Sequence, residues 1–149
     1  MPVPMPLVRR ALLLFVALAA FGAAAIARAA DAPVSAADGA AIRQVIQSQM
    51  QAFAKDDGAR AFGYASPTIQ EIFRTADNFM AMVRSDYRPV YRPRRVEFGP
   101  VEEVDGEPVQ HVWITGPDGQ DVEALYTMQR QRDGSWRING CDLRRANDA

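Results

Sequence analysis

Three Asp-Gly dipeptides, each between two runs of strand-forming residues, constrain the fold of this chain more than any other feature. They occupy residues 105–106, 118–119 and 133–134. Asp-Gly favours the positive φ angles of tight hairpin turns. Three such turns join four strands, which we expect over residues 94–104, 109–115, 121–130 and 135–143. The second half of the chain is therefore predicted to be an antiparallel meander.

The apolar alternation within two of these strands predicts the shape of the sheet. In the third strand one face carries Val122, Ala124, Tyr126 and Met128. In the last strand the alternation changes phase after Gly140, which predicts a β-bulge there. Because bulged strands bend, we expect a curved sheet with a buried concave side. On the opposite side, Val112, Ile114 and Leu125 are expected to form an exposed apolar face.

The first half of the chain is predicted to be helical. Apolar residues recur at helical spacing from Ile42 to Phe53, after a capping box that Ser35 and Asp38 form. Further helices are expected over residues 58–66, from residue 67 and from residue 76. Pro89 and Pro93 predict an extended connector. The fold class is therefore α+β: N-terminal helices packed on a curved four-stranded antiparallel meander.

The first 29 residues have the features of a bacterial signal peptide. Arg9 and Arg10 precede an uncharged apolar run over residues 11–26, and Ala27 to Ala29 gives the A-x-A cleavage pattern. The run is shorter than the ~20 residues that span a bilayer. We expect cleavage after Ala29, or two residues earlier, and export to the periplasm or the medium without a membrane anchor.

The remaining chain is predicted to be one domain. Residues 30–34 form a flexible lead-in, residues 35–145 the domain and residues 146–149 a tail. Without the leader the chain carries 14 basic and 18 acidic residues, a net charge of −4. That balance disfavours nucleic acid as a partner.

Four stretches resemble the exported bacterial family known as domain of unknown function 4864 (DUF4864). They are the first helix with Ile46, Phe53 and Asp56-Asp57; residues 79–83; YRPVYRPRR at 87–95; and residues 122–143 with EALYTM and WRINGC. Helices followed by a curved meander are also similar to the cone-shaped fold of the nuclear transport factor two-like (SnoaL-like) superfamily, a cystatin-like arrangement of helices on a curved sheet. That superfamily holds isomerases, dehydratases, hydrolases and non-catalytic proteins, so the resemblance implies a fold but no activity.

A few residues are candidates for chemistry. His111 is the only histidine, and a strand histidine hydrogen-bonded to backbone is the alternative to a general base. Tyr64, Tyr126 and Asp142 would converge if the sheet curves, and a tyrosine beside a carboxyl can move a proton or stabilise an oxyanion. Cys141, the only cysteine, is predicted to fill the core. No metal-ligand spacing and no cofactor motif is found.

The connector is the most basic stretch of the chain. Its candidates for binding a phosphate, a carboxylate or an acidic polymer are Arg88, Tyr91, Arg92, Arg94 and Arg95. The alternative is a solvated segment in which arginines stack on tyrosines or pair with nearby carboxylates.

Three functions remain open at this level. The first is non-catalytic binding of a small molecule or a protein partner in the concave face of the sheet. The second is a cofactor-independent lyase, isomerase or hydrolase in which Asp142 or His111 acts with Tyr126. The third is an interaction module without a pocket, which forms a homodimer through the exposed sheet face.

Overall fold

The computed structural model describes residues 34–145, in which helices precede a sheet as the sequence predicts. The helices are α1 (Ala36–Ala54), α2 (Gly58–Gly63), α3 (Pro67–Phe73), α4 (Ala76–Asp86) and α5 (Arg88–Tyr91). The strands are β1 (Arg95–Val104), β2 (Glu107–Thr115), β3 (Asp121–Arg130) and β4 (Trp136–Arg145). They form one antiparallel sheet in the order β1-β2-β3-β4. The α+β meander is confirmed.

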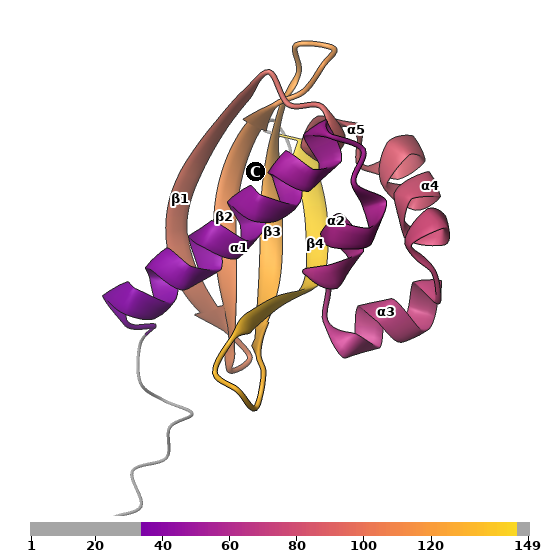
Figure 1. Ribbon diagram of the computed structural model, residues 1–149. Coiled ribbons are helices and arrows are strands. Elements are labelled where there is room, and N and C mark those ends of the chain that lie inside the picture. Colours follow the sequence, from indigo (N-terminus) through magenta and orange to yellow (C-terminus); the bar gives the residue numbers. More distant parts are fainter. Residues whose placement is uncertain (1–33, 146–149) are drawn as a thin grey trace, which may run out of the picture.

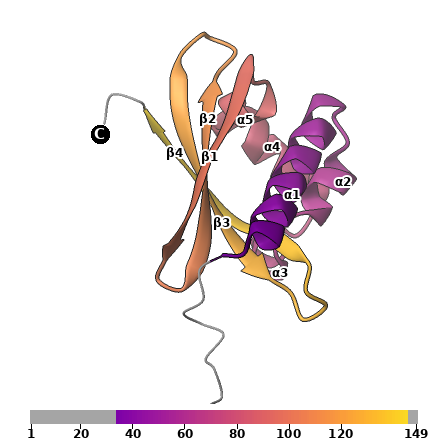
Figure 2. The same ribbon diagram turned by 90° about the vertical axis from the view of Figure 1, so that its left-hand side faces the viewer.

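All the helices lie on one side of a twisted sheet, with α1 running obliquely across it (Figures 1 and 2). Within residues 34–145, no helix is long and apolar enough to cross a membrane. The predicted signal peptide and the tail after residue 145 lie outside the described residues.

Each Asp-Gly dipeptide lies in a hairpin loop, but only the first forms a two-residue turn with both residues at positive φ. Asp105 has φ +52° and Gly106 has φ +81°. In the other two loops only the glycine is at positive φ, and the aspartate accepts a backbone hydrogen bond: Asp118 from the Gln120 N–H and Asp133 from the Ser135 N–H. Asp-Gly thus reverses the chain in two ways: both residues adopt positive φ in the first loop, and the aspartate side chain bonds to the backbone in the other two.

The bulge predicted in the last strand is present. Ile138 pairs with Met128 and Gly140 pairs with Thr127, so that Asn139 is the extra residue. The Asn139 Oδ1 accepts a hydrogen bond from the Ser66 hydroxyl at 2.7 Å, and the Ser66 N–H donates to the Ile138 carbonyl at 2.8 Å. The bulge therefore attaches the edge strand β4 to the segment that begins α3, which protects part of that edge.

A second bulge, which the sequence did not predict, bends β1 between Phe98 and Val101. Gln110 is buried and donates from Nε2 to the carbonyls of Gly99 and Pro100 at 2.8 and 3.3 Å. The Gln110 side chain thus provides hydrogen bonds to two carbonyls of β1 at the bulge, where the regular pairing with β2 is interrupted.

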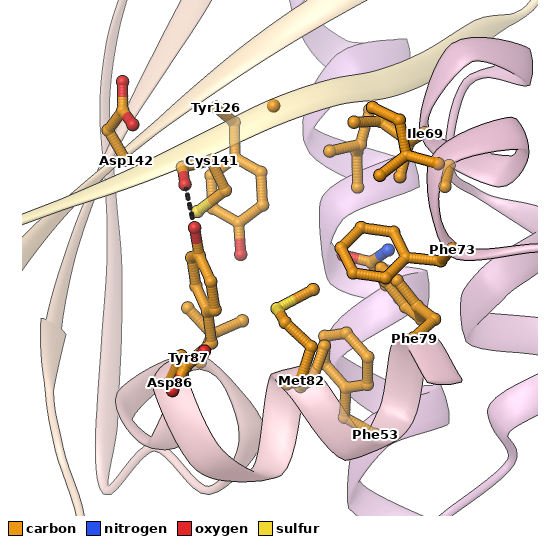
Figure 3. A pocket seen from close by; sticks show the side chains of 17 residues that line it. Phe53, Ile69, Phe73, Phe79, Met82, Asp86, Tyr87, Tyr126, Cys141 and Asp142 are labelled. Carbon is orange, nitrogen blue, oxygen red and sulfur yellow. Dashed lines mark hydrogen bonds between the residues drawn. The ribbon is translucent and has the colours of Figure 1, made fainter. Parts of the chain in front are cut away.

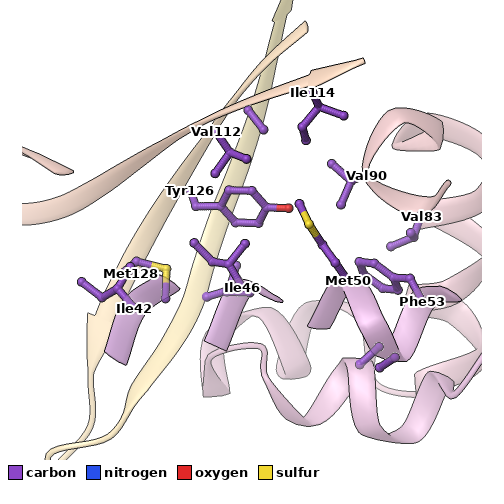
Figure 4. Close-up of a cluster of buried hydrophobic side chains, with 14 of the residues drawn as sticks. Ile42, Ile46, Met50, Phe53, Val83, Val90, Val112, Ile114, Tyr126 and Met128 are labelled. Carbon is purple, nitrogen blue, oxygen red and sulfur yellow. The ribbon is translucent and has the colours of Figure 1, made fainter. Parts of the chain in front are cut away.

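The core lies between α1 and the concave face of the sheet (Figure 4). Ile42, Ile46 and Phe53 from α1 pack on it, as their spacing predicts, together with Val83 of α4 and Val90 of α5. From the sheet the core takes Val112, Ile114, Ala124, Tyr126, Met128, Trp136 and Ile138. The buried face of β3 is therefore the one that the sequence predicted.

Three details of the prediction are wrong. Val112 and Ile114 point into the core, and their neighbour Trp113 is the residue on the outer face, 47% exposed. The outer face is therefore less apolar than expected. The predicted extended connector contains the helix α5. Pro89 is compatible with this helix because it stands in the first turn, where a backbone N–H has no partner within the helix. The second helix ends at Gly63, since Ala65 pairs with Ile138 instead.

Candidate functional site

A pocket of about 490 Å³ lies between the helices and the last two strands, and we call it the helix–sheet pocket (Figure 3). The residues that line it are Gln49, Phe53, Ala65, Ile69, Ile72, Phe73, Phe79, Met82, Val83, Asp86, Tyr87, Val90, Tyr126, Ile138, Gly140, Cys141 and Asp142. Its size falls within the range of small-molecule sites, ~300–1,000 Å³. Most of its wall is aliphatic or aromatic, so the pocket suits an apolar molecule.

The two ends of the pocket differ in polarity. Ile69, Phe73 and Phe79 form one end, and Tyr87 and Cys141 stand at the other, close to Asp86 (Figure 3). The side chain of Asp142 points away from Cys141 toward the outer face of the sheet (Figure 3). The pocket therefore has a direction, with an apolar end beneath α3 and a polar end where α4 meets β4.

Tyr126 is the most unusual residue of this wall. It belongs to β3, is 1% exposed, and its hydroxyl has no nitrogen or oxygen partner within the described part of the chain. Desolvation is the main cause that raises the pKa of this phenol well above its ordinary value, and the Cys141 thiol, a weak polar partner of the hydroxyl, adds to this effect. A buried hydroxyl without a partner costs ~1–3 kcal/mol, and such a group in a pocket wall can be satisfied by a ligand.

Tyr87 stands beside Tyr126 in the same wall but has a partner. Its hydroxyl donates a hydrogen bond to the Cys141 carbonyl at 2.8 Å, which links the end of α4 to β4 (Figure 3). Desolvation raises the pKa of Tyr87, and the negative charges of Asp142 and Asp86 add to this effect.

Cys141 is half-buried and packs against the core, as the sequence predicts for a small apolar residue. Desolvation raises the pKa of its thiol to about 12. The thiolate is the nucleophilic form of cysteine, so this thiol is unreactive near neutral pH.

The structure brings only one of the proposed proton-transfer side chains into the pocket. Tyr126 lines it, whereas His111 and the side chain of Asp142 lie on the outer face of the sheet, on either side of Leu125. Tyr64 is separate as well, and its hydroxyl accepts a hydrogen bond from the Arg60 Nε at 3.3 Å. Convergence of Tyr64 with Tyr126 is therefore not observed: Tyr64 does not line the pocket, although the next residue, Ala65, does.

His111 is held between two carboxylates rather than by backbone groups. Its Nδ1 lies 2.6 Å from Glu123 of β3, and its Nε2 lies 2.9 Å from Glu102 of β1. Among the described residues, no group of three side chains has the arrangement of a metal site. The hydrogen bond to Glu123 is the main cause that raises the pKa of His111, and Glu102 adds to it.

This arrangement predicts a pH dependence of stability. The folded protein holds the His111 proton more tightly than the unfolded chain, whose histidine pKa is ~6.5. The stabilisation is thus complete below pH ~6.5 and is lost as the pH rises through the raised pKa. Urea unfolding of tag-free protein between about pH 6 and pH 9 should show a falling free energy of unfolding, and the His111→Gln variant should flatten that profile. Identical profiles for both proteins would contradict the assignment.

One of the predicted basic residues, Arg92, lies with Tyr91 against Asp56 just after the end of α1. Asp56 accepts hydrogen bonds from the Tyr91 hydroxyl and from Arg92 at 3.0 Å, and the Tyr91 bond is the main cause that lowers the pKa of Asp56. Arg92 also donates to the Phe53 carbonyl at 2.6 Å and stacks on the Tyr91 ring. Arg92 thus caps the C-terminal end of α1 by donating to a backbone carbonyl of its last turn, a common role for arginine.

The other arginines of this stretch stay at the surface. Arg95 pairs with Glu97 at 3.1 Å, while Arg88 and Arg94 are exposed. None of the arginines proposed as ligand-binding residues lines the helix–sheet pocket.

Sequence reasoning missed Asp86 and Tyr87 because it ended the apolar stripe of the fourth helix at Val83. Phe79, Val83 and Tyr87 follow one another at intervals of four, which puts them on one face of a helix that continues to Asp86. Following that periodicity for one more turn would have placed Tyr87 beside the other pocket residues.

Comparison with known protein families gives a match over most of the chain. The family described as "Domain of unknown function (DUF4864)" matches residues 35–149. No curated protein and no solved structure matches the chain.

Proposed function

The chain belongs to the family described as domain of unknown function (DUF4864), and from that premise we propose that it is a non-catalytic binding protein whose helix–sheet pocket holds a small apolar molecule. One observation carries the proposal: Tyr126, whose hydroxyl is buried and without a nitrogen or oxygen partner among residues 34–145, lines an apolar pocket. A ligand with one polar atom would satisfy that hydroxyl and bury its apolar body against the aromatic wall.

The arrangement of the reactive groups supports binding over catalysis. His111 is separated from Tyr126 by the sheet, so the two form no acid–base pair. The raised pKa of the Cys141 thiol, about 12, keeps that group protonated. Asp142 is exposed to solvent, and its side chain lies on the outer face with His111, so Tyr126 faces the pocket without a proposed proton-transfer partner.

We further propose that the fold is of the nuclear transport factor two-like kind and that the protein acts outside the cytoplasm. Helices packed on one face of an antiparallel meander, with a pocket between them, support the first point. The leader at residues 1–29 supports the second. Sequencing the N-terminus of protein taken from a periplasmic fraction should find Ala30 or Arg28 first; an intact leader on cytoplasmic protein would exclude export.

A pair of tyrosine variants tests the binding site. Tyr126→Phe removes an unpaired buried hydroxyl, so the free energy of unfolding of the unliganded protein should rise by about 1 kcal/mol. Tyr87→Phe, the matched control, removes the donor to the Cys141 carbonyl and should lower it by about 1 kcal/mol. Denaturant unfolding without ligand measures both changes. A loss of stability in Tyr126→Phe would show that its hydroxyl has a partner in the folded protein.

Binding is measured with 1-octanol as a neutral apolar probe. Calorimetric titration should detect octanol binding to the unmodified protein, with an affinity about five- to tenfold lower in Tyr126→Phe, the worth of one hydrogen bond. The Tyr87→Phe variant should retain most of the affinity, because its hydroxyl is already engaged. Absence of octanol binding to the unmodified protein would overturn the proposed function.

A further inference from the structure

We propose that the ligand of the helix–sheet pocket is a neutral aromatic molecule with a hydrogen-bond donor, such as a phenol, and that this donor pairs with the side-chain oxygen of Gln49. The inference rests on the proposed function, because it names the chemical class that the same pocket would select. It depends on three features of the pocket: the amide of Gln49, the aromatic rings in the wall, and the charges around it. None of these features involves the Tyr126 hydroxyl.

Gln49 is a buried polar residue in a largely apolar wall. It is 3% exposed and stands one helical turn before Phe53 on α1, so that both side chains reach the pocket. Its Nε2 donates a hydrogen bond to the Ala61 carbonyl of α2 at 3.1 Å. Because a carbonyl oxygen can only accept, this contact sets the orientation of the amide and leaves its Oε1 on the other side.

The Oε1 of Gln49 is an acceptor that receives no hydrogen bond from residues 34–145, where the Nε2 contact is the one bond of this side chain. Unlike the Tyr126 hydroxyl, it is not fully enclosed by protein, so a molecule in the pocket can reach it. An unpaired oxygen on a buried side chain costs free energy, which a ligand O–H or N–H would recover. A ligand that can only accept hydrogen bonds gains nothing from this oxygen.

Aromatic rings and a thioether make up much of the remaining wall. The ring centre of Phe79 lies 6.2 Å from that of Phe53 and 5.6 Å from that of Phe73, and Met82 lines the same pocket (Figure 3). Aromatic pairs prefer edge-to-face or offset contacts, and a methionine sulfur packs favourably against a ring. A planar aromatic ligand can therefore make contacts that an alkyl chain with the same number of carbons cannot.

The charges around the pocket favour a neutral ligand. Among its described lining residues there is no lysine, arginine or histidine, so an anion would lose its hydration without gaining a pairing group. A cation would lose its hydration as well, and Asp86 is too exposed to compensate for that loss. A phenol at neutral pH is uncharged and avoids both costs.

Three neutral probes test this inference by calorimetric titration: 4-ethylphenol, 4-ethylanisole and 1-octanol. The phenol and the alcohol have the same number of carbons and one hydroxyl each, and the anisole is the phenol with its donor capped by a methyl group. The unmodified protein should bind 4-ethylphenol about two- to tenfold more tightly than 4-ethylanisole, the worth of one hydrogen bond. It should also prefer 4-ethylphenol to octanol about two- to tenfold, the worth of an aromatic contact.

Gln49→Met and Gln70→Met are the matched variants. Methionine has the length of glutamine without its amide, so Gln49→Met should bind the phenol and the anisole with equal affinity. Gln70 also donates from its amide to backbone carbonyls, those of Phe62 and Ala65, but it does not line the helix–sheet pocket. Gln70→Met should therefore keep the preference for the phenol.

The outcomes separate this inference from the proposed function. Equal affinity of the unmodified protein for the phenol and the anisole would overturn the pairing with Gln49, and so would an unchanged preference in Gln49→Met. Octanol binding at least as tightly as 4-ethylphenol would overturn the aromatic class. In these cases octanol binding would leave the proposed function standing, whereas failure of all three probes to bind would overturn that function itself.

Discussion

Replacing Val112 with aspartate is expected to abolish cooperative folding, or to lower the free energy of unfolding by more than about 4 kcal/mol. Val112 is fully buried in the cluster between the sheet and α1. A carboxylate there would lose its hydration, and none of its core neighbours is charged. Since a domain of this size is stable by only ~5–15 kcal/mol, one uncompensated buried charge removes much of that margin. Circular dichroism during urea titration measures the loss.

The same substitution at an exposed valine is the control. Val104 is 45% exposed at the end of β1, so Val104→Asp should change the free energy of unfolding by at most about 0.5 kcal/mol. The pair tests the direction in which β2 faces, because the opposite assignment would expose Val112. Equal tolerance of aspartate at both positions would show that Val112 does not point into the core.

Truncation of Ile46 to alanine should be the second most damaging change, at about 2–5 kcal/mol. Ile46 lies in the middle of α1, is fully buried, and packs against the sheet beside Tyr126 (Figure 4). The variant loses the transfer free energy of three carbon atoms and leaves a cavity that neighbouring rigid elements close only in part. Denaturant unfolding should show a lower midpoint with an unchanged slope.

Ile72→Ala is the matched control for that prediction. Ile72 is 64% exposed on α3, so its truncation should cost no more than about 0.5 kcal/mol. Because Ile72 also lines the helix–sheet pocket, the variant should weaken octanol binding while the fold stays intact. Similar losses of stability at both isoleucines would mean that α1 does not form the centre of the core.

The candidate site was predictable only in part. Tyr126 was placed on the buried face from the alternation of β3, and it lines the pocket. Asp142 was expected to converge with it if the sheet curves, but its side chain points to the outer face, because it pairs with Leu125. Asp86 and Tyr87 were missed, although helical periodicity extended past Val83 would have included Tyr87. His111 was a candidate because of its chemistry alone, and chemistry does not say on which face of a sheet a residue lies.

The misassigned face of β2 has a similar cause. Val109, Gln110, His111, Val112, Trp113 and Ile114 give both faces of that strand large apolar side chains. The alternation of side chains along β2 therefore fits burial of either face, and pairing with the neighbouring strands decides which face is buried. In the fold Gln110 points inward because the bulge in β1 leaves carbonyls that its amide can satisfy.

The sequence alone determined the elements whose cause is local: the four hairpin strands from Asp-Gly turns, the caps of the helices from Ser35, Ser66 and Thr75, and the bulge beside Gly140. Tertiary structure decided what depends on distant contacts. It decided which face of β2 is buried. It also brought Tyr91 and Arg92 into hydrogen-bonding contact with Asp56 and left a pocket between the helices and β4. Turn and cap chemistry acts over a few bonds, whereas burial and pocket shape depend on packing between segments that sequence spacing does not relate.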